Sequence, residues 1–155
     1  MFVSVIDTNV YLSAFFASDG RAAQCVHFAY TQGAALHSRE TYHELSEKMR
    51  ERCSKDVFSD ARIQRYLAFV DKRSIMLPVE PGITSCKDKT DNKFLDLAVT
   101  GKADYIISGD HHLLNMKNIR GIGHTVQIVS PAGLVRAFQE SSAFAALRPQ
   151  HHVLK

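Results

Sequence analysis

Two aspartates directly follow short apolar segments, and both are of the type that binds metal ions. Asp7 comes immediately after residues 2–6, and Asp110 follows residues 105–107 after a two-residue turn. Short apolar runs with β-branched residues are typical of strands buried on both faces of a parallel sheet. Because ligands bind beyond the carboxyl ends of such strands, we expect both carboxylates at one edge of one sheet. A single Asp after a strand often only caps a turn, but two such residues favour a functional site.

A third acid, Asp91, lies in an expected helix over residues 88–100. At about 100° per residue, Asp91 falls on the apolar face of this helix. A carboxylate on that face is costly to bury unless it is capped, paired or bound to a metal ion. Capping is an equally good interpretation, with Asp88 as the N-cap and Asp91 three residues later, as in a capping box. Asp96 falls on the opposite, polar face, where we expect it to be solvated.

Glu44 belongs to an expected helix over residues 39–53, on the side opposite the apolar stripe. Periodicity therefore predicts a solvated surface glutamate. The pattern alone gives no reason to assign it to a site.

The expected elements alternate between strands and helices, which predicts a parallel sheet covered on both faces. The expected strands are residues 2–6, 34–37, 75–79, 105–107 and 126–129. The expected helices are residues 8–16, 21–31, 39–53, 59–71 and 88–100, with another beginning at Ser130-Pro131. We expect one domain over residues 1–140 and a C-terminal tail over 141–155.

The composition is ordinary for a soluble globular protein of 155 residues, and the net charge of +3 permits an anionic partner without requiring one. No apolar run approaches the ~18 residues that span a bilayer, so we expect no membrane association. Three scattered cysteines without a C-x-x-C pair, together with the lack of a signal-peptide pattern, favour a cytoplasmic protein with reduced thiols.

Four segments in order resemble the PIN-domain family. They are a strand ending in Asp-Thr-Asn-Val (residues 5–10), a Ser before a helix with Glu-Leu (38–45), a helix with Asp91 (88–98), and a strand ending in Ser-Gly-Asp (103–110) followed by Leu-Leu. The chain looks most like the VapC-like branch, the toxins of bacterial toxin–antitoxin systems. It departs from that branch at Lys89-Thr90, where Pro-Asp is frequent, and at Ser108, where Thr is usual.

The resemblance implies a three-layer α/β/α domain with a central parallel sheet of about five strands. It also implies RNA hydrolysis with Mg²⁺ or Mn²⁺, a homodimer and an antitoxin partner. The catalytic and metal-binding acids that it implies are Asp7, Glu44, Asp91 and Asp110, with Asp96 as a further outer carboxylate. Thr8, Asn9 and Ser108 would be auxiliary polar contacts. Basic residues beside these acids could contact RNA, although each one alone is better explained as a surface charge: Arg39, Lys87, Lys89 and Lys93.

Hard divalent cations suit this chemistry, because they activate water and stabilise the leaving oxygen of a phosphodiester. The sequence has no G-x-S-x-G motif, and its histidines lack metal-binding spacing.

Two other functions remain open. A haloacid-dehalogenase-like phosphatase also has an Asp after its first strand, but it needs a second Asp two residues later, where this chain has Asn9. A PIN-like domain without activity could serve as a binding module, although all four acids are present. A nucleotide-binding Rossmann domain is disfavoured, because no G-x-G-x-x-G follows the first strand.

Overall fold

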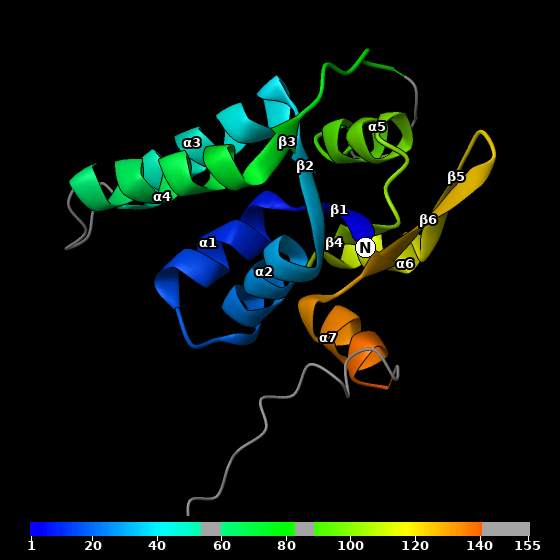
Figure 1. The fold of residues 1–155 in the computed structure, drawn as a ribbon. Helices are drawn as coiled ribbons and strands as arrows, with labels where there is room; N and C mark the ends of the chain where they lie inside the picture. The colour runs from blue at the N-terminus through cyan, green and yellow to red at the C-terminus, as the bar shows by residue number, and fades with distance from the viewer. Residues whose placement is uncertain (54–59, 83–88, 141–155) are drawn as a thin grey trace, which may run out of the picture.

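The computed structural model describes residues 1–53, 60–82 and 89–140, which form a central sheet with helices on both faces (Figure 1). The strands are β1 (Phe2–Ile6), β2 (Gly33–His37), β3 (Ser74–Met76), β4 (Tyr105–Ile107), β5 (Asn118–Gly121) and β6 (His124–Val129). The helices are α1 (Thr8–Phe16), α2 (Arg21–Gln32), α3 (Arg39–Cys53), α4 (Asp60–Arg73), α5 (Asn92–Thr100), α6 (His111–Met116) and α7 (Pro131–Gln139). The predicted three-layer α/β/α class is confirmed.

The strands follow the order β3-β2-β1-β4-β6-β5 across the sheet. β1 runs parallel to its neighbours β2 and β4, and the pairs β2–β3 and β4–β6 are parallel as well. Among the strands in the described residues, only β5 runs antiparallel to its neighbour, which is β6. The carboxyl ends of β1, β2, β4 and β6 therefore lie along one edge of the sheet.

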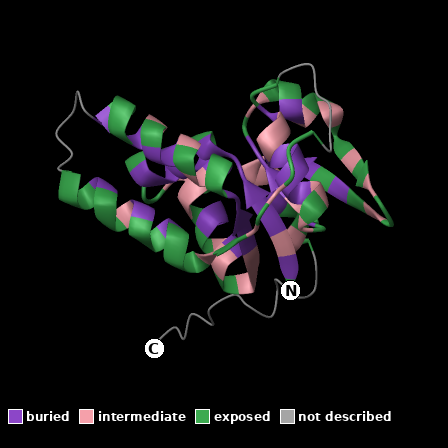
Figure 2. Cartoon of the chain, turned by 90° about the horizontal axis from the view of Figure 1, so that it is seen from above, coloured by how far each residue is buried: buried purple, intermediate pink, exposed green. Residues whose placement is uncertain are grey.

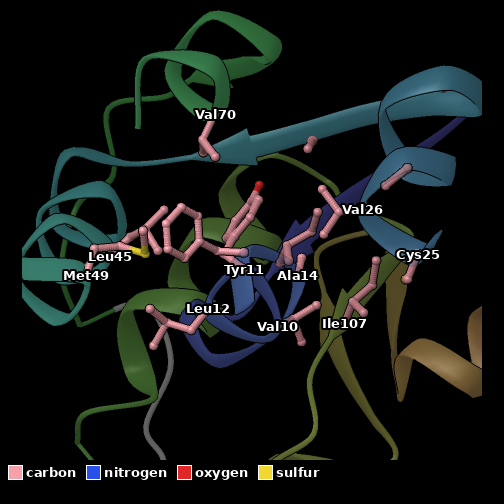
Figure 3. Close-up of a cluster of buried hydrophobic side chains, with 14 of the residues drawn as sticks. Val10, Tyr11, Leu12, Ala14, Cys25, Val26, Leu45, Met49, Val70 and Ile107 are labelled. Carbon is pink, nitrogen blue, oxygen red and sulfur yellow. The ribbon is translucent and has the colours of Figure 1, made fainter. Parts of the chain in front are cut away.

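Two hydrophobic clusters attach the helices to the two faces of the sheet. Adjacent residues of β1 point to opposite faces, so that Ile6 belongs to the larger cluster and Val5 to the smaller one. The larger cluster includes side chains of α1, α2, α3, α4 and α7, and Figure 3 shows part of it around Tyr11 and Leu12 of α1. The smaller cluster includes side chains of α5 and α6. Figure 2 shows the buried residues gathered on the strands and on the helix sides that face them.

The structure differs from the expected elements at several boundaries. α5 begins at Asn92, later than the expected start at Asp88, which is therefore wrong. Asp88 itself lies outside the described residues, and so does the expected tail 141–155. β3 ends at Met76 rather than at residue 79.

The sequence pattern does not predict α6 or β5. β5 contains a single large apolar residue and forms an edge of the sheet, where burial imposes little hydrophobic pattern.

Among the described residues, no helix combines the length and the apolar character that a membrane span requires.

Candidate active site

The pairing of β1 with β4 brings Asp7 next to the segment that carries Asp110. Ile6 pairs with Ile107, and the backbone N–H of Asp7 donates to the Ile107 carbonyl at 2.9 Å. The next residue, Ser108, donates from its hydroxyl to Oδ2 of Asp7 at 2.7 Å. The same Ser108 oxygen accepts the backbone N–H of Asp110 at 3.0 Å. Ser108 therefore connects the two strand-end aspartates and fixes one oxygen of Asp7.

Asp110 also has a structural role. Its Oδ1 accepts the backbone N–H of His112 at 2.8 Å, which makes it the N-cap of α6. The capping interpretation of a strand-end Asp thus applies to Asp110, alongside its position at the cavity described next.

The four acids singled out in the sequence line a single cavity of about 340 Å³ at the carboxyl edge of the sheet. They come from the residue after β1, from α3, from the residue before α5 and from the turn after β4. Among the residues that the structure describes, the lining consists of Asp7, Asn9, Glu44, Lys48, Thr90, Asp91, Lys93, Phe94 and Asp110. We call this space the acidic cavity.

Asp91 is buried, as its place on the apolar face of the expected helix predicts, although the observed helix α5 begins only at the next residue. It precedes the first residue of α5 and makes no side-chain capping hydrogen bond there. The capping-box interpretation, in which Asp91 follows an N-cap at Asp88, is therefore wrong, because the helix begins after Asp91.

Glu44 is not the solvated surface residue that periodicity predicts. Its side chain is only 17% exposed, and its Oε1 lies 2.8 Å from Nζ of Lys48, one turn later on α3. Its Oε2 forms an ion pair with Nζ of Lys93 on α5. The periodicity of α3 could not reveal this, because the burial of Glu44 depends on a side chain from another helix.

The environments of Asp7 and Glu44 shift their pKa values in opposite directions. Burial raises the pKa of Asp7, and the charge of Glu44 adds to this effect, although the hydrogen bond from Ser108 opposes it. Burial by itself would also raise the pKa of Glu44, but the hydrogen bonds and charges of Lys48 and Lys93 outweigh burial and lower it. The cavity therefore disfavours the charge of Asp7 while it stabilises that of Glu44.

Asp96 lies elsewhere, and the expectation that it is solvated is wrong. It is 3% exposed, and its Oδ2 accepts the backbone N–H of Gly82 at 3.2 Å. Asp96 lines a second cavity of about 380 Å³ and is absent from the lining of the acidic cavity. The second cavity is lined by Ser38, Glu40, Val79, Pro81, Gly82, Lys89, Asn92, Lys93 and Asp96. Lys93 lines both spaces, so they adjoin each other.

The remaining predicted residues have different positions. Asn9 lines the acidic cavity, whereas Thr8 is buried beside a small separate cavity that His37 also lines. Arg39 and Lys89 are exposed, and Lys87 lies outside the described residues. Lys48 is not among the predicted site residues, although its position four residues after Glu44 on one helix indicates that the two side chains can pair.

The donor set of the acidic cavity suits a hard divalent cation, since carboxylate oxygens are the ligands that such ions prefer. The four carboxylates are not close enough together, however, to coordinate one metal ion as they stand. In the part of the chain that the structure describes, no three His, Cys, Asp or Glu side chains are arranged to hold a metal ion. One physical reason for this arrangement is that Glu44 forms ion pairs with two lysines, which hold its carboxylate away from a shared ligand position.

Comparison with known proteins agrees with this fold. An uncharacterized protein of Methanocaldococcus jannaschii is 27% identical over 120 residues, which are 74% of each protein. A chain from the structure of VapBC2 from Rickettsia felis, bound to a DNA fragment from their promoter, aligns with 83% of this chain and 98% of its own length, at a TM-score of 0.57 and 11% identity. The structure of PAE2754 from Pyrobaculum aerophilum aligns over 88% of this chain and 94% of its own length, at a TM-score of 0.53 and 15% identity.

A protein-family model described as PIN domain matches residues 3–112, which is well over half of the chain. Proteins with this domain are generally nucleases and generally use divalent metal ions. This chain belongs to the PIN-domain family.

Proposed function

We propose that this protein is an endoribonuclease that hydrolyses RNA phosphodiester bonds at the acidic cavity with the help of Mg²⁺ or Mn²⁺. The observation that carries the proposal is the meeting of Asp7, Glu44, Asp91 and Asp110 around one cavity. These acids come from four separate segments, and a cluster of carboxylates is costly unless a cation compensates it.

A divalent ion bound here would supply an activated water and stabilise the leaving oxygen. Asp7, Asp91 and Asp110 are the proposed ligands at the centre, with Glu44 beside them. Ser108 holds the Asp7 carboxylate in place through its hydrogen bond. Asp96 lines the adjoining second cavity, so we propose for it at most an indirect role outside the shell of metal ligands.

The basic residues around the two cavities support an RNA substrate. Lys93 and Lys48 line the acidic cavity, and Lys89 lines the second cavity next to it. Ammonium groups at this position would offset phosphate charge. Arg39, at the start of α3, and Lys87 remain proposed RNA contacts.

We further propose that the protein is the toxin of a type II toxin–antitoxin pair and acts in the cytoplasm as a homodimer that an antitoxin inhibits. The resemblance of its sequence to the VapC-like branch supports this proposal, and its likeness in fold to a chain of VapBC2 is consistent with it.

A direct cleavage assay tests the proposed activity. Purified protein, separated from any bound partner, should cleave RNA when Mn²⁺ or Mg²⁺ is present and should stop when EDTA is added. Turnover of p-nitrophenyl phosphate with RNA left intact would instead support the phosphatase alternative. Tight RNA binding without any cleavage would support the binding-module alternative.

Metal binding should also appear as a change in thermal stability. Ions that bind the folded protein alone stabilise it by mass action, so millimolar Mn²⁺ should raise the melting temperature of the wild type. Asp7→Asn should reduce this shift, because it removes a ligand charge. Differential scanning fluorimetry with and without Mn²⁺ measures both effects, and an equal Mn²⁺ shift in the two proteins would place the binding site elsewhere.

The metal-free proteins provide a second comparison. Because the pKa of Asp7 is raised in the folded state, its contribution to stability is present below its unfolded pKa and is lost as the pH rises through its folded pKa. Metal-free Asp7→Asn should therefore be at least as stable as the wild type at neutral pH, and its stability relative to the wild type should fall as the pH is lowered towards the unfolded pKa.

A further inference from the structure

The acidic cavity contains two ammonium groups in addition to its four carboxylates. Lys48 and Lys93 line it together with Asp7, Glu44, Asp91 and Asp110, so the formal charge of the described lining is −2. One divalent cation would make the cavity neutral. A second divalent cation would leave an excess of positive charge in a partly buried space, which is unfavourable before substrate arrives.

The two lysines form ion pairs with both carboxylate oxygens of Glu44. Nζ of Lys48 lies 2.8 Å from Oε1 of Glu44, and Nζ of Lys93 contacts Oε2. These ion pairs are shielded from solvent to differing degrees, since the side chains of Lys93 and Lys48 are 27% and 40% exposed. An ion approaching Glu44 would have to displace an ammonium group and would be repelled by it.

We propose that the cavity takes a single divalent ion, and that Lys48 and Lys93 stand beside Glu44 where a second ion would otherwise bind. This inference rests on the proposed metal-dependent function of the same cavity. It also gives Glu44 a narrower role. Asp7, Asp91 and Asp110 would hold the single ion, and Glu44 would act as a positioning residue that holds the two lysines towards the substrate phosphate.

The number of bound ions tests this proposal without any measurement of cleavage. Free Mn²⁺ can be counted by electron paramagnetic resonance during titration of the full chain without RNA. The wild type should bind one Mn²⁺ ion. The double variant Lys48→Met/Lys93→Met should bind two, because Glu44 is released as a ligand. Adding Glu44→Gln to the double variant should return the number to one.

Lys72→Met is the matched control, because Lys72 is exposed on α4 and is absent from the lining of the cavity. It makes the same change in net charge as each single lysine substitution and should bind one ion with wild-type affinity. If the double variant does not fold, Lys48→Met alone can test the proposal. Lys48 is the more exposed of the two lysines, so its replacement should disturb the fold less. Removal of one competing ammonium group should then raise the Mn²⁺ affinity by about three- to tenfold over Lys72→Met.

The outcomes separate this inference from the proposed function. Two ions on the wild type would overturn the inference and leave a metal-dependent nuclease standing. A folded double variant that binds one ion at unchanged affinity, or a folded Lys48→Met with the affinity of Lys72→Met, would also overturn the inference. A wild type that binds no Mn²⁺ would overturn both.

Discussion

Asp7→Asn and Asp110→Asn should each reduce metal-dependent RNA cleavage by at least about 100-fold while the fold survives. Each change removes a ligand charge from the acidic cavity and keeps the size of the side chain. The amide oxygen introduced by Asp7→Asn can still accept the Ser108 hydroxyl, and the one introduced by Asp110→Asn can still accept the His112 N–H and cap α6. Initial rates on a labelled RNA, at saturating Mn²⁺, measure the loss.

Asp19→Asn is the matched control, since Asp19 is exposed in the turn before α2 and its variant should cleave at the wild-type rate. Asp96→Asn should lose less activity than Asp7→Asn, because Asp96 lines the second cavity and the amide could still accept the Gly82 N–H. Circular dichroism confirms that each variant is folded. Undiminished cleavage by a folded Asp7→Asn protein would refute the mechanism proposed for the acidic cavity.

Ile106→Ala should lower the free energy of unfolding by about 2–5 kcal/mol. Ile106 is fully buried in β4, pairs with Val5 of β1 and Ile128 of β6, and belongs to the hydrophobic cluster that holds α5 and α6. Truncation removes apolar contacts and leaves a cavity that neighbouring strands cannot close. This loss is a large part of the about 5–15 kcal/mol that stabilises a typical domain.

Urea unfolding of the metal-free protein measures this change. Ile122→Ala is the same substitution at a residue that is 96% exposed in the hairpin between β5 and β6, so it should change the free energy of unfolding by less than about 0.5 kcal/mol. Equal unfolding midpoints for Ile106→Ala and Ile122→Ala would mean that β4 does not contribute to the stability of the core as described.

Features that depend on one element could be predicted from the sequence. The apolar runs at residues 2–6 and 105–107 specify buried strands, and the polar residue after each run lies at the carboxyl edge because parallel strands share that edge. The burial of Asp91 follows from its alignment with the apolar face of α5, which begins at the next residue.

Features that depend on contacts between elements could not be predicted in this way. Glu44 is held by Lys93, which lies 49 positions later in the sequence and on a different helix. Asp96 is on the polar face of α5, yet the backbone N–H of Gly82 donates to it, and Pro81 lines the second cavity with it. The family resemblance groups Glu44 with the other acids, and the structure places it at the same cavity, whereas periodicity predicts an exposed residue.

The central place of β1 has a consequence for how the protein is made. β1 can pair with β2 soon after synthesis starts. Its other neighbour, β4, comes about a hundred positions later in the sequence, which is also the separation of Asp7 from its hydrogen-bond partner Ser108. A nascent chain that stops before β4 leaves one edge of β1 open, and such edges promote aggregation. The same unfinished chain also lacks Asp110, so incomplete translation products should be inert towards RNA until most of the polypeptide has left the ribosome.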